Sequence, residues 1–220
     1  MNDRTTKQAL ITGASSGIGK ATALGFAAVG INLALVSRES ENLEAVATAA
    51  REFGVKAEAY PLDLAKIEQV QMGYTGSLTE TPLADWQNVL DLNLTSVWQC
   101  ILGILPGMRD RRSGIIINVS SIAGTQTFPN WGAYCVSKFG LMALSKTLAA
   151  EERAGGIRVT AICPGSVNTP MWDTESVQAD FDRSAMLTPE IVAQSILHAV
   201  QLPTSAVIEE ITLMSNAGVL

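Results

Sequence analysis

Two polar side chains, Tyr134 and Lys138, are four residues apart in a segment with helical periodicity, so both lie on one face of that helix. A lysine ammonium close to a phenol favours the phenolate and lowers the pKa of the tyrosine from about 10 towards working pH. Such a tyrosine can give a proton to an alkoxide or take one from an alcohol. The pair is a candidate for general acid/base chemistry, although the same spacing also occurs in surface pairs.

Two more side chains could serve the same chemistry. Ser121 follows a β-branched run at 115–120 and so stands at the carboxyl end of a buried strand, where open α/β sheets place ligands. Asn93 lies in mid-helix, and because asparagine is a poor helix former, an inward amide that holds a water is plausible. The alternatives are an ordinary strand-to-loop serine and a local helix bend.

A glycine-rich turn, TGASSGIG at 12–19, joins a predicted strand to a predicted helix. Gly13 allows a tight turn, Gly17 lets the backbone approach a pyrophosphate, and Gly19 permits close packing. Phosphates would then sit on free N–H groups at the positive end of the helix. A plain structural turn is the alternative. The predicted phosphate-binding residues are Gly13, Ser15, Ser16, Gly17, Ile18 and Gly19.

The end of the second predicted strand indicates which dinucleotide binds. An acidic residue there binds the free 2′-hydroxyl of NAD, whereas a basic one accommodates the 2′-phosphate of NADP. Ser37 is neutral and Arg38 is basic, which favours NADP(H) over NAD(H), unless Arg38 is only an exposed surface residue. Asp63, followed by Leu64, could accept a hydrogen bond from an adenine amino group or cap the next helix.

The elements that must position these residues alternate between short strands and longer helices. This alternation predicts an α/β fold: a Rossmann-type, doubly wound parallel sheet with three layers (αβα), formed by a single domain over 1–220. The predicted strands are 8–12, 31–37, 56–61, 115–120, 157–163 and 206–213, and the predicted helices are 17–29, 41–53, 83–111, 132–154 and 188–200. Pro106 is expected to bend or break the helix at 83–111.

Composition limits the function classes. The chain has 220 residues, 47% of them hydrophobic and 16% charged, with a net charge of −6, so we expect a folded protein without a nucleic-acid partner. We expect neither a signal peptide nor a membrane span, because no uninterrupted apolar run reaches about 18 residues. Three cysteines without metal-ligand spacing are typical of reduced core thiols in a cytoplasmic protein, and no metal site is predicted.

Taken together and in this order, these motifs resemble the short-chain dehydrogenase/reductase (SDR) family from about residue 7 to residue 170. The family's Asn, Ser, Tyr and Lys tetrad falls on Asn93, Ser121, Tyr134 and Lys138, with the usual thirteen-residue step from serine to tyrosine. Pro164 and Gly165 open the family's proline-glycine loop, in which the backbone of Val167 and the hydroxyl of Thr169 would hold the nicotinamide carboxamide.

The resemblance implies an NADP(H)-dependent oxidoreductase that moves hydride between nicotinamide and a small or acyl carbonyl or a secondary alcohol, without a metal. It assigns Tyr134 as general acid/base, Lys138 as the group that lowers its pKa and binds the nicotinamide ribose, and Ser121 as the group that orients the carbonyl. Asn93 would hold a water of the proton relay. Family members are usually homotetramers or homodimers that pack helices 83–111 and 132–154 against symmetry mates.

The substrate is left open between a 3-oxoacyl-carrier-protein reductase and a general carbonyl reductase. The C-terminal segment at 208–214 lacks the Asp/Asn-Gly-Gly ending common in the former, which lowers the case for it. Residues 166–187 are expected to form a lid over the site. Its apolar candidates for substrate contact are Met171, Trp172, Phe181 and Met186, and two aromatics that precede Tyr134 could line the pocket as well, Phe128 and Trp131. The alternative for these side chains is ordinary loop packing.

One interval does not fit the family. A crossover and a strand need about 17 residues, and 62–81 contains no readable strand and no Asn-Asn-Ala-Gly motif. We therefore predict a missing segment at the junction of Gln71 and Met72, either lost from the chain or absent from the sequence as written. A true loss would leave two inner strand edges unpaired. The strands on either side would then have to pair with each other, or the sheet would not form. It motivates a second hypothesis, a catalytically weak nucleotide-binding or scaffolding protein.

Overall fold

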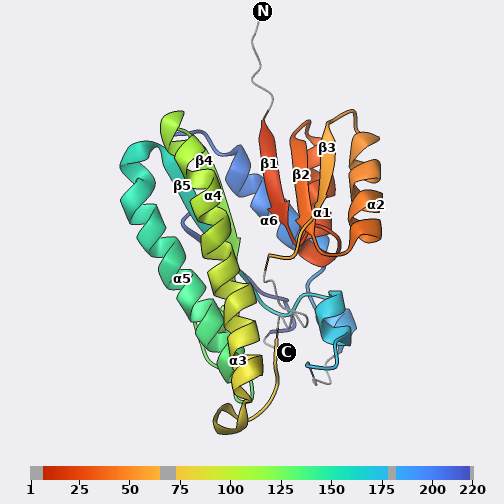
Figure 1. Cartoon of the computed structure of the whole chain (residues 1–220), viewed down its shortest axis with the longest axis vertical. Helices are drawn as coiled ribbons and strands as arrows, with labels where there is room; N and C mark the ends of the chain where they lie inside the picture. Colours follow the sequence, from red (N-terminus) through yellow and green to blue (C-terminus); the bar gives the residue numbers. More distant parts are fainter. Residues whose placement is uncertain (1–6, 65–72, 178–181, 219–220) are drawn as a thin grey trace, which may run out of the picture. The chain divides into compact units, whose positions relative to one another are not determined.

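The computed structural model describes residues 7–64, 73–177 and 182–218 (Figure 1). These residues fall into two compact units. Unit 1 contains the chain up to Leu64 together with Asn168–Pro170 and Thr188–His198, and unit 2 contains the remainder. The predicted junction at Gln71 and Met72 and the lid residue Phe181 lie outside the described residues.

Unit 1 is built on a parallel sheet with the strand order β1-β2-β3. Its strands are β1 (Gln8–Thr12), β2 (Asn32–Ser37) and β3 (Ala57–Pro61), connected by helices α1 (Gly17–Ala28) and α2 (Ser40–Arg51). β2 is the central strand, and its Leu33 and Leu35 are almost fully buried. Both helices pack against β2, as expected for a β-α-β unit.

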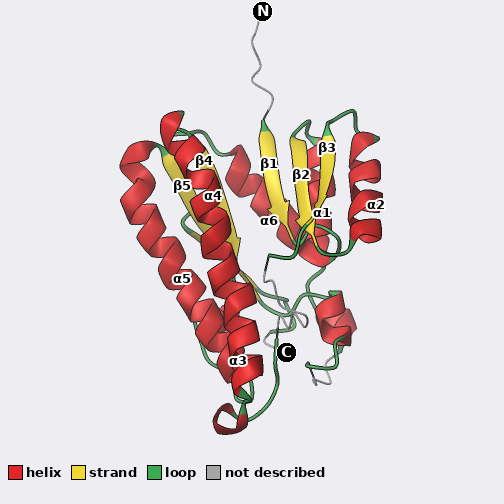
Figure 2. Cartoon of the chain, in the orientation of Figure 1, coloured by secondary structure: helices red, strands yellow, loops and turns green. Residues whose placement is uncertain are grey.

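Unit 2 contains a second parallel sheet with the order β4-β5-β6. Figure 2 shows β4 and β5 next to one another. Its strands are β4 (Gly114–Val119), β5 (Ile157–Pro164) and β6 (Glu210–Leu213), and its longest helix is α5 (Gly132–Glu152). β5 is buried along nearly its whole length, which agrees with its continuous apolar sequence. Helices α4 and α5 share a core with this sheet, formed by Ile101, Leu105, Ile116, Leu148, Ile157 and Val159.

The predicted helix 83–111 is one helical segment with an irregular turn. It consists of α3 (Leu83–Leu90), a π-helical turn (Asp91–Thr95) and α4 (Ser96–Asp110). Pro106 lies inside α4, so the expected break at the proline is wrong. The irregularity is at Asn93 instead, as a single π-turn of the kind that often marks a functional site.

The helix over Leu83–Asp110 is long and apolar enough to cross a membrane by length and composition, with a mean hydropathy of 1.3. Our expectation that the chain has no candidate membrane span is therefore wrong by this criterion, because it considered only uninterrupted apolar runs. A core helix of a folded domain meets the same criteria, and α4 contributes Ile101 and Leu105 to the core of unit 2.

The sheet differs from the single continuous one that we predicted. The described strands form two three-stranded sheets, with β1 at an edge of one and β4 at an edge of the other. The α/β class and the parallel pairing are confirmed, but among the described strands no pairing joins the two sheets. The remaining elements are α6 (Pro189–Gln201), in place of the helix predicted at 188–200, and five 3-10 helices: η1 (Leu78–Glu80), η3 (Ile122–Gly124), η4 (Arg153–Gly155), η5 (Pro170–Asp173) and η6 (Arg183–Ala185).

Candidate active site

The glycine-rich turn of unit 1 has the geometry that its sequence predicts. Gly13 and Gly17 adopt positive φ values of 63° and 50°, which side-chain-bearing residues rarely do. A Cβ atom at Gly19 would lie 2.2 Å from the carbonyl oxygen of Gly13, so only glycine lets α1 begin so close to the turn. A Cβ at Gly17 would lie 3.1 Å from Cγ2 of Thr169, which places this predicted nicotinamide-binding residue beside the turn.

The start of α1 is suited to an anion. Ser16 is the N-cap residue but makes no side-chain capping hydrogen bond, so the helix N-terminus has no such cap of its own. Ser15 Oγ instead lies 2.8 Å from Ser37 Oγ, joining the glycine turn to the end of β2. A pyrophosphate on this turn and a ribose at Ser37 would therefore be neighbours, as a dinucleotide requires.

The residues that would meet the adenosine ribose lie at the carboxyl end of the strands of this sheet. Arg38 is exposed, and the carboxylate of the following Glu39 accepts a hydrogen bond of 2.7 Å from Asn42. Leu62 N donates to Ser37 O over 3.0 Å, so Asp63 follows β3 at the same end of the sheet. Whether Asp63 caps a helix stays a prediction, because the residues after Leu64 lie outside the described ranges.

In unit 2, Ser121 and Tyr134 face one another. A side-chain hydrogen bond between Ser121 and the Tyr134 hydroxyl lowers the pKa of the tyrosine. The serine is itself held in place, because its Oγ accepts a hydrogen bond of 3.1 Å from Ala123 N and lies 3.5 Å from the carbonyl oxygen of Pro164. The structure thus brings Ser121 and Tyr134 together, and their roles in orienting a carbonyl and in acid/base chemistry stay predictions.

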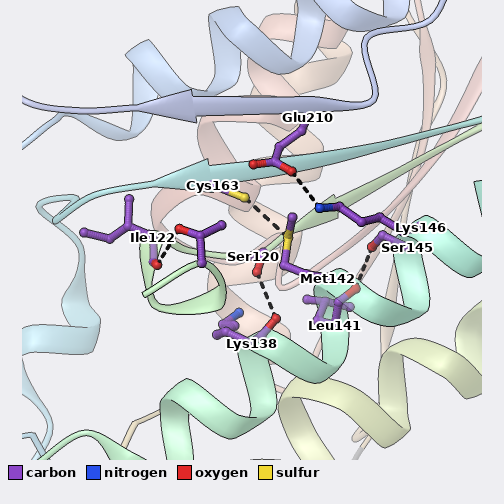
Figure 3. Close-up of polar contacts among 10 residues, drawn as sticks. Ser120, Ile122, Lys138, Leu141, Met142, Ser145, Lys146, Cys163 and Glu210 are labelled. Atoms are coloured by element: carbon purple, nitrogen blue, oxygen red, sulfur yellow. Dashed lines mark hydrogen bonds and ion pairs between the residues drawn. The ribbon is translucent and has the colours of Figure 1, made fainter. Parts of the chain in front are cut away.

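Lys138 completes this group from the next turn of α5. Its Nζ lies 5.5 Å from the centre of the Tyr134 ring and donates to the carbonyl oxygen of Val119 over 3.2 Å. Figure 3 shows how the surrounding backbone is secured: Ser120 Oγ donates to the Lys138 carbonyl over 3.4 Å. One turn further on, Met142 Sδ lies 3.4 Å from Cys163 Sγ, which packs α5 onto β5.

The pKa values run opposite to the sequence-based expectation. Burial raises the pKa of Tyr134 to about 12, and the hydrogen bond with Ser121 offsets only part of this rise. Burial also lowers the pKa of Lys138 to about 8. Spacing alone predicted that the ammonium would favour the phenolate, but loss of solvent disfavours the charged form of both groups and is the larger effect here.

Asn93 is linked to Tyr134 through a residue that our sequence analysis missed. Its Nδ2 donates to Ser137 Oγ over 3.1 Å, and Ser137 Oγ donates to the Tyr134 carbonyl over 2.7 Å. Asn93 is buried and Ser137 is completely so, which fits the inward amide that we predicted. The available signal was a serine inside a helix, directly before Lys138, where a buried hydroxyl needs hydrogen-bond partners.

The proline-glycine loop leaves β5 in an ordered conformation. Gly165 N donates to Leu213 O over 2.8 Å, and Val167 pairs with Leu187 in a short parallel bridge. The indole Nε1 of Trp172 donates to the carbonyl oxygen of Val167 over 2.8 Å. The described part of the predicted lid thus consists of two short 3-10 helices, η5 and η6, whose connections return to this loop.

A dinucleotide fits the residues of unit 1. The close approach at Gly13 and Gly19, the uncapped start of α1 and the contact between Ser15 and Ser37 together form a backbone cradle that side chains would fill. No group of three or more His, Cys, Asp or Glu side chains gathers in the parts of the chain that the structure describes.

The short chain dehydrogenase family model matches residues 7–75 and 72–180. The chain belongs to the short-chain dehydrogenase family. Its sequence is 34% identical over 202 residues to a 3-oxoacyl-[acyl-carrier-protein] reductase of Synechocystis, covering 82% of this chain and 81% of the relative. The predicted resemblance is confirmed.

Solved structures agree with this assignment. An alcohol dehydrogenase from Thermococcus sibiricus, complexed with 5-hydroxy-NADP, superposes with a TM-score of 0.86 at 26% identity, covering 96% of this chain and 97% of that one. A variant of the actinorhodin polyketide ketoreductase with NADPH gives a TM-score of 0.85 at 26% identity, covering 99% of both chains. The Rossmann-type fold class is therefore confirmed.

Some of the relatives are longer than this chain, which spans only part of their length. The chain spans 64% of an oxidoreductase of Mycobacterium tuberculosis strain H37Rv and 18% of the glycine betaine reductase of Emericella nidulans. The family match also falls into two parts that overlap at 72–75, within the interval 62–81 in which the sequence shows no readable strand. The missing segment at Gln71 and Met72 stays a prediction.

Proposed function

We propose that the chain is an NADP(H)-dependent carbonyl reductase that moves hydride between nicotinamide and a small or acyl carbonyl or secondary alcohol. The observation that carries the proposal is the grouping of Ser121, Tyr134 and Lys138, with Asn93 linked to the tyrosine through Ser137. Proton transfer to a carbonyl oxygen requires a general acid, a group that orients the carbonyl, and a cation that stabilises the conjugate base of the acid.

In this mechanism the cofactor supplies the hydride when it is bound. Tyr134, whose pKa is about 12, is protonated at neutral pH and gives its hydroxyl proton to the substrate oxygen. Ser121, whose hydroxyl lies beside this phenol, gives up its present acceptor, donates to the substrate oxygen and fixes its orientation. Lys138, which here donates to the carbonyl of Val119, would hold the nicotinamide ribose when the cofactor is bound, and it stabilises the phenolate that forms. Asn93 holds the water that returns a proton.

The choice of NADP(H) rests on Ser37 and Arg38. A guanidinium at the end of β2 can bind a 2′-phosphate, and Ser37 offers no carboxylate for a free 2′-hydroxyl. The two solved relatives above carry NADP-type cofactors. The phosphates would lie on the glycine turn, and Val167 and Thr169 would hold the carboxamide.

The deciding experiment is turnover on a panel of ketones with NADPH and with NADH, in the wild type and in Tyr134→Phe. Tyr60→Phe is the matched control, because Tyr60 is an exposed tyrosine on β3. We expect NADPH-dependent reduction that is lost only in Tyr134→Phe. Turnover that survives in Tyr134→Phe would contradict the proposed role of the phenol.

A second candidate function is a catalytically weak nucleotide-binding or scaffolding protein. The observation that favours it is the division of the sheet into two, with β1 and β4 at edges. NADPH binding measured by fluorescence, without turnover of any ketone and unchanged by Tyr134→Phe, would support this candidate over the reductase.

We also propose that the protein is cytoplasmic and forms homo-oligomers. The long helices expose large apolar side chains, which a symmetry mate would cover: Trp98 and Leu102 on α4, and Val136 and Phe139 on α5. Sedimentation analysis of the wild type and of a Trp98→Glu, Phe139→Glu variant tests this. We expect the wild type to sediment as a dimer or tetramer and the variant as a monomer.

A further inference from the structure

Three aromatic rings lie in a row beside the proposed proton donor. The Trp131 and Tyr134 ring centres are 5.6 Å apart, and the Trp131 and Trp172 ring centres are 5.9 Å apart. Both pairs are edge-to-face, with interplanar angles of 68°. All three side chains belong to unit 2, and each is only partly buried and so keeps some accessible surface.

The two tryptophans are held in place. Trp131 follows Asn130, which adopts a positive φ of 65°, and it pairs with Gly76 in an isolated bridge. A Cβ at Gly73 would lie 3.3 Å from Cζ3 of Trp131, so the loop packs directly against the indole. Trp172 is fixed by its Nε1 hydrogen bond of 2.8 Å to Val167. Rigid rings of this kind offer contact area without losing much conformational entropy on binding.

The charge of the lid bears on how a substrate could arrive. Residues 166–187 contain four acidic side chains but a single basic one, Arg183, and Arg183 is paired with Asp173 at 2.5 Å. A substrate carried on a phosphopantetheine arm brings a phosphate, which this segment would repel. A free, uncharged ketone meets no such penalty.

Granting the proposed reductase function, we propose that Trp131 and Trp172 form an aromatic wall that selects a free carbonyl compound with a planar ring on or next to its carbonyl carbon. The ring of such a substrate would stack or pack edge-to-face on the tryptophans while its carbonyl oxygen meets Tyr134 and Ser121. A flexible acyl chain gains less from rings arranged in this way and loses more entropy on binding.

The test compares kcat/KM for acetophenone and 2-octanone, which have the same number of carbon atoms, and for acetoacetyl-coenzyme A. We expect acetophenone to be preferred over both. In Trp131→Leu and Trp172→Leu the preference over 2-octanone should fall about three- to tenfold each, through KM more than kcat. Trp172→Phe keeps a ring but loses the indole N–H, and should retain most of the preference.

Phe53→Leu is the matched control, because it removes an exposed aromatic ring in unit 1. It should change neither the preference nor kcat/KM. Equal use of the two ketones by the wild type, or a preference for the thioester, would overturn the aromatic wall while leaving the reductase function intact. An unchanged preference in both leucine variants would overturn it as well.

Binding provides a readout that does not need turnover. Acetophenone should quench tryptophan fluorescence saturably in the wild type and in Tyr134→Phe, and much less in Trp131→Leu and Trp172→Leu. If no ketone is reduced but this quenching is present, the proposed function fails and the aromatic wall stands. If quenching is absent or is the same in every variant, the wall is wrong whatever the catalytic result.

Discussion

The side-chain amide of Asn93 donates a hydrogen bond of 3.1 Å to Ser137 Oγ, and so ties the π-helical turn to α5 three residues after Tyr134. We predict that Ser137→Ala lowers kcat about tenfold, because the turn that carries Tyr134 then loses its connection to Asn93. Removing one partner of a buried hydrogen bond should also destabilise the fold by about 1–3 kcal/mol.

A matched control exists on the same helix. Ser145 is also buried, donates to the carbonyl of Leu141 over 2.7 Å and accepts from Asn118 over 2.8 Å, but it lies about three turns from Tyr134. Ser145→Ala should cost similar stability in thermal melts while leaving kcat unchanged. If the two variants lose kcat equally, Ser137 is only structural.

Lys138 should make the cofactor-free protein more stable as the pH rises. Burial lowers its pKa from 10.5 to about 8, so between these values the unfolded chain binds a proton that the folded chain does not, and the free energy of unfolding increases with pH. Lys138→Met should therefore stabilise the protein at pH 7, and this gain should shrink towards pH 10. The exposed Lys146, changed to Met, should show no such trend in melting temperature.

Cofactor selectivity should depend on the end of β2. In the double variant Ser37→Asp, Arg38→Ala, the new carboxylate can bind a free 2′-hydroxyl and repels a 2′-phosphate, so kcat/KM should shift towards NADH by about tenfold or more. Raised salt should weaken NADPH binding in the wild type and much less in the variant. The control Arg111→Ala should leave the cofactor selectivity unchanged. Unchanged selectivity in the double variant would reject Arg38 as the phosphate ligand.

The ion pair between Arg109 on α4 and Glu152 on α5 should stabilise unit 2 only above acidic pH. Arg109 Nε donates to Glu152 Oε2 over 3.0 Å, and this hydrogen bond holds the pKa of the carboxyl below its usual range. Its contribution is present above the ordinary pKa of about 4.3 and is lost as pH falls through the folded value. Glu152→Gln should melt earlier than the wild type at pH 7, and the difference should narrow as the pH is lowered below about 4.

Restoring a strand should stabilise the protein if a segment is missing at Gln71 and Met72. We predict that inserting the corresponding segment of the Synechocystis relative, at least about 17 residues for a crossover and a strand, raises the melting temperature and tightens NADPH binding. A polar, glycine-rich insert of equal length is the control. Equal melting temperatures for the two inserts would count against the missing strand.

Much of this arrangement follows from sequence patterns. The glycine spacing at 13–19 and the step from Ser121 to Tyr134 predict local geometry, because each depends on residues of one turn or one helix face. The pKa of Tyr134 could not be predicted in this way, since it depends on how much solvent the whole fold excludes. The contact between Asn93 and Ser137 joins two helices, and spacing along one helix carries no information about it.

Unit 1 draws residues Thr188–His198 from near the far end of the chain. During synthesis its sheet therefore emerges early but lacks part of its packing until the ribosome has translated most of the message. An ending before Thr188 should expose the N-terminal half to proteases as well as remove the last helix. A truncation late in the chain would thus destabilise the glycine-rich turn and the strands of unit 1, which lie far away in the sequence.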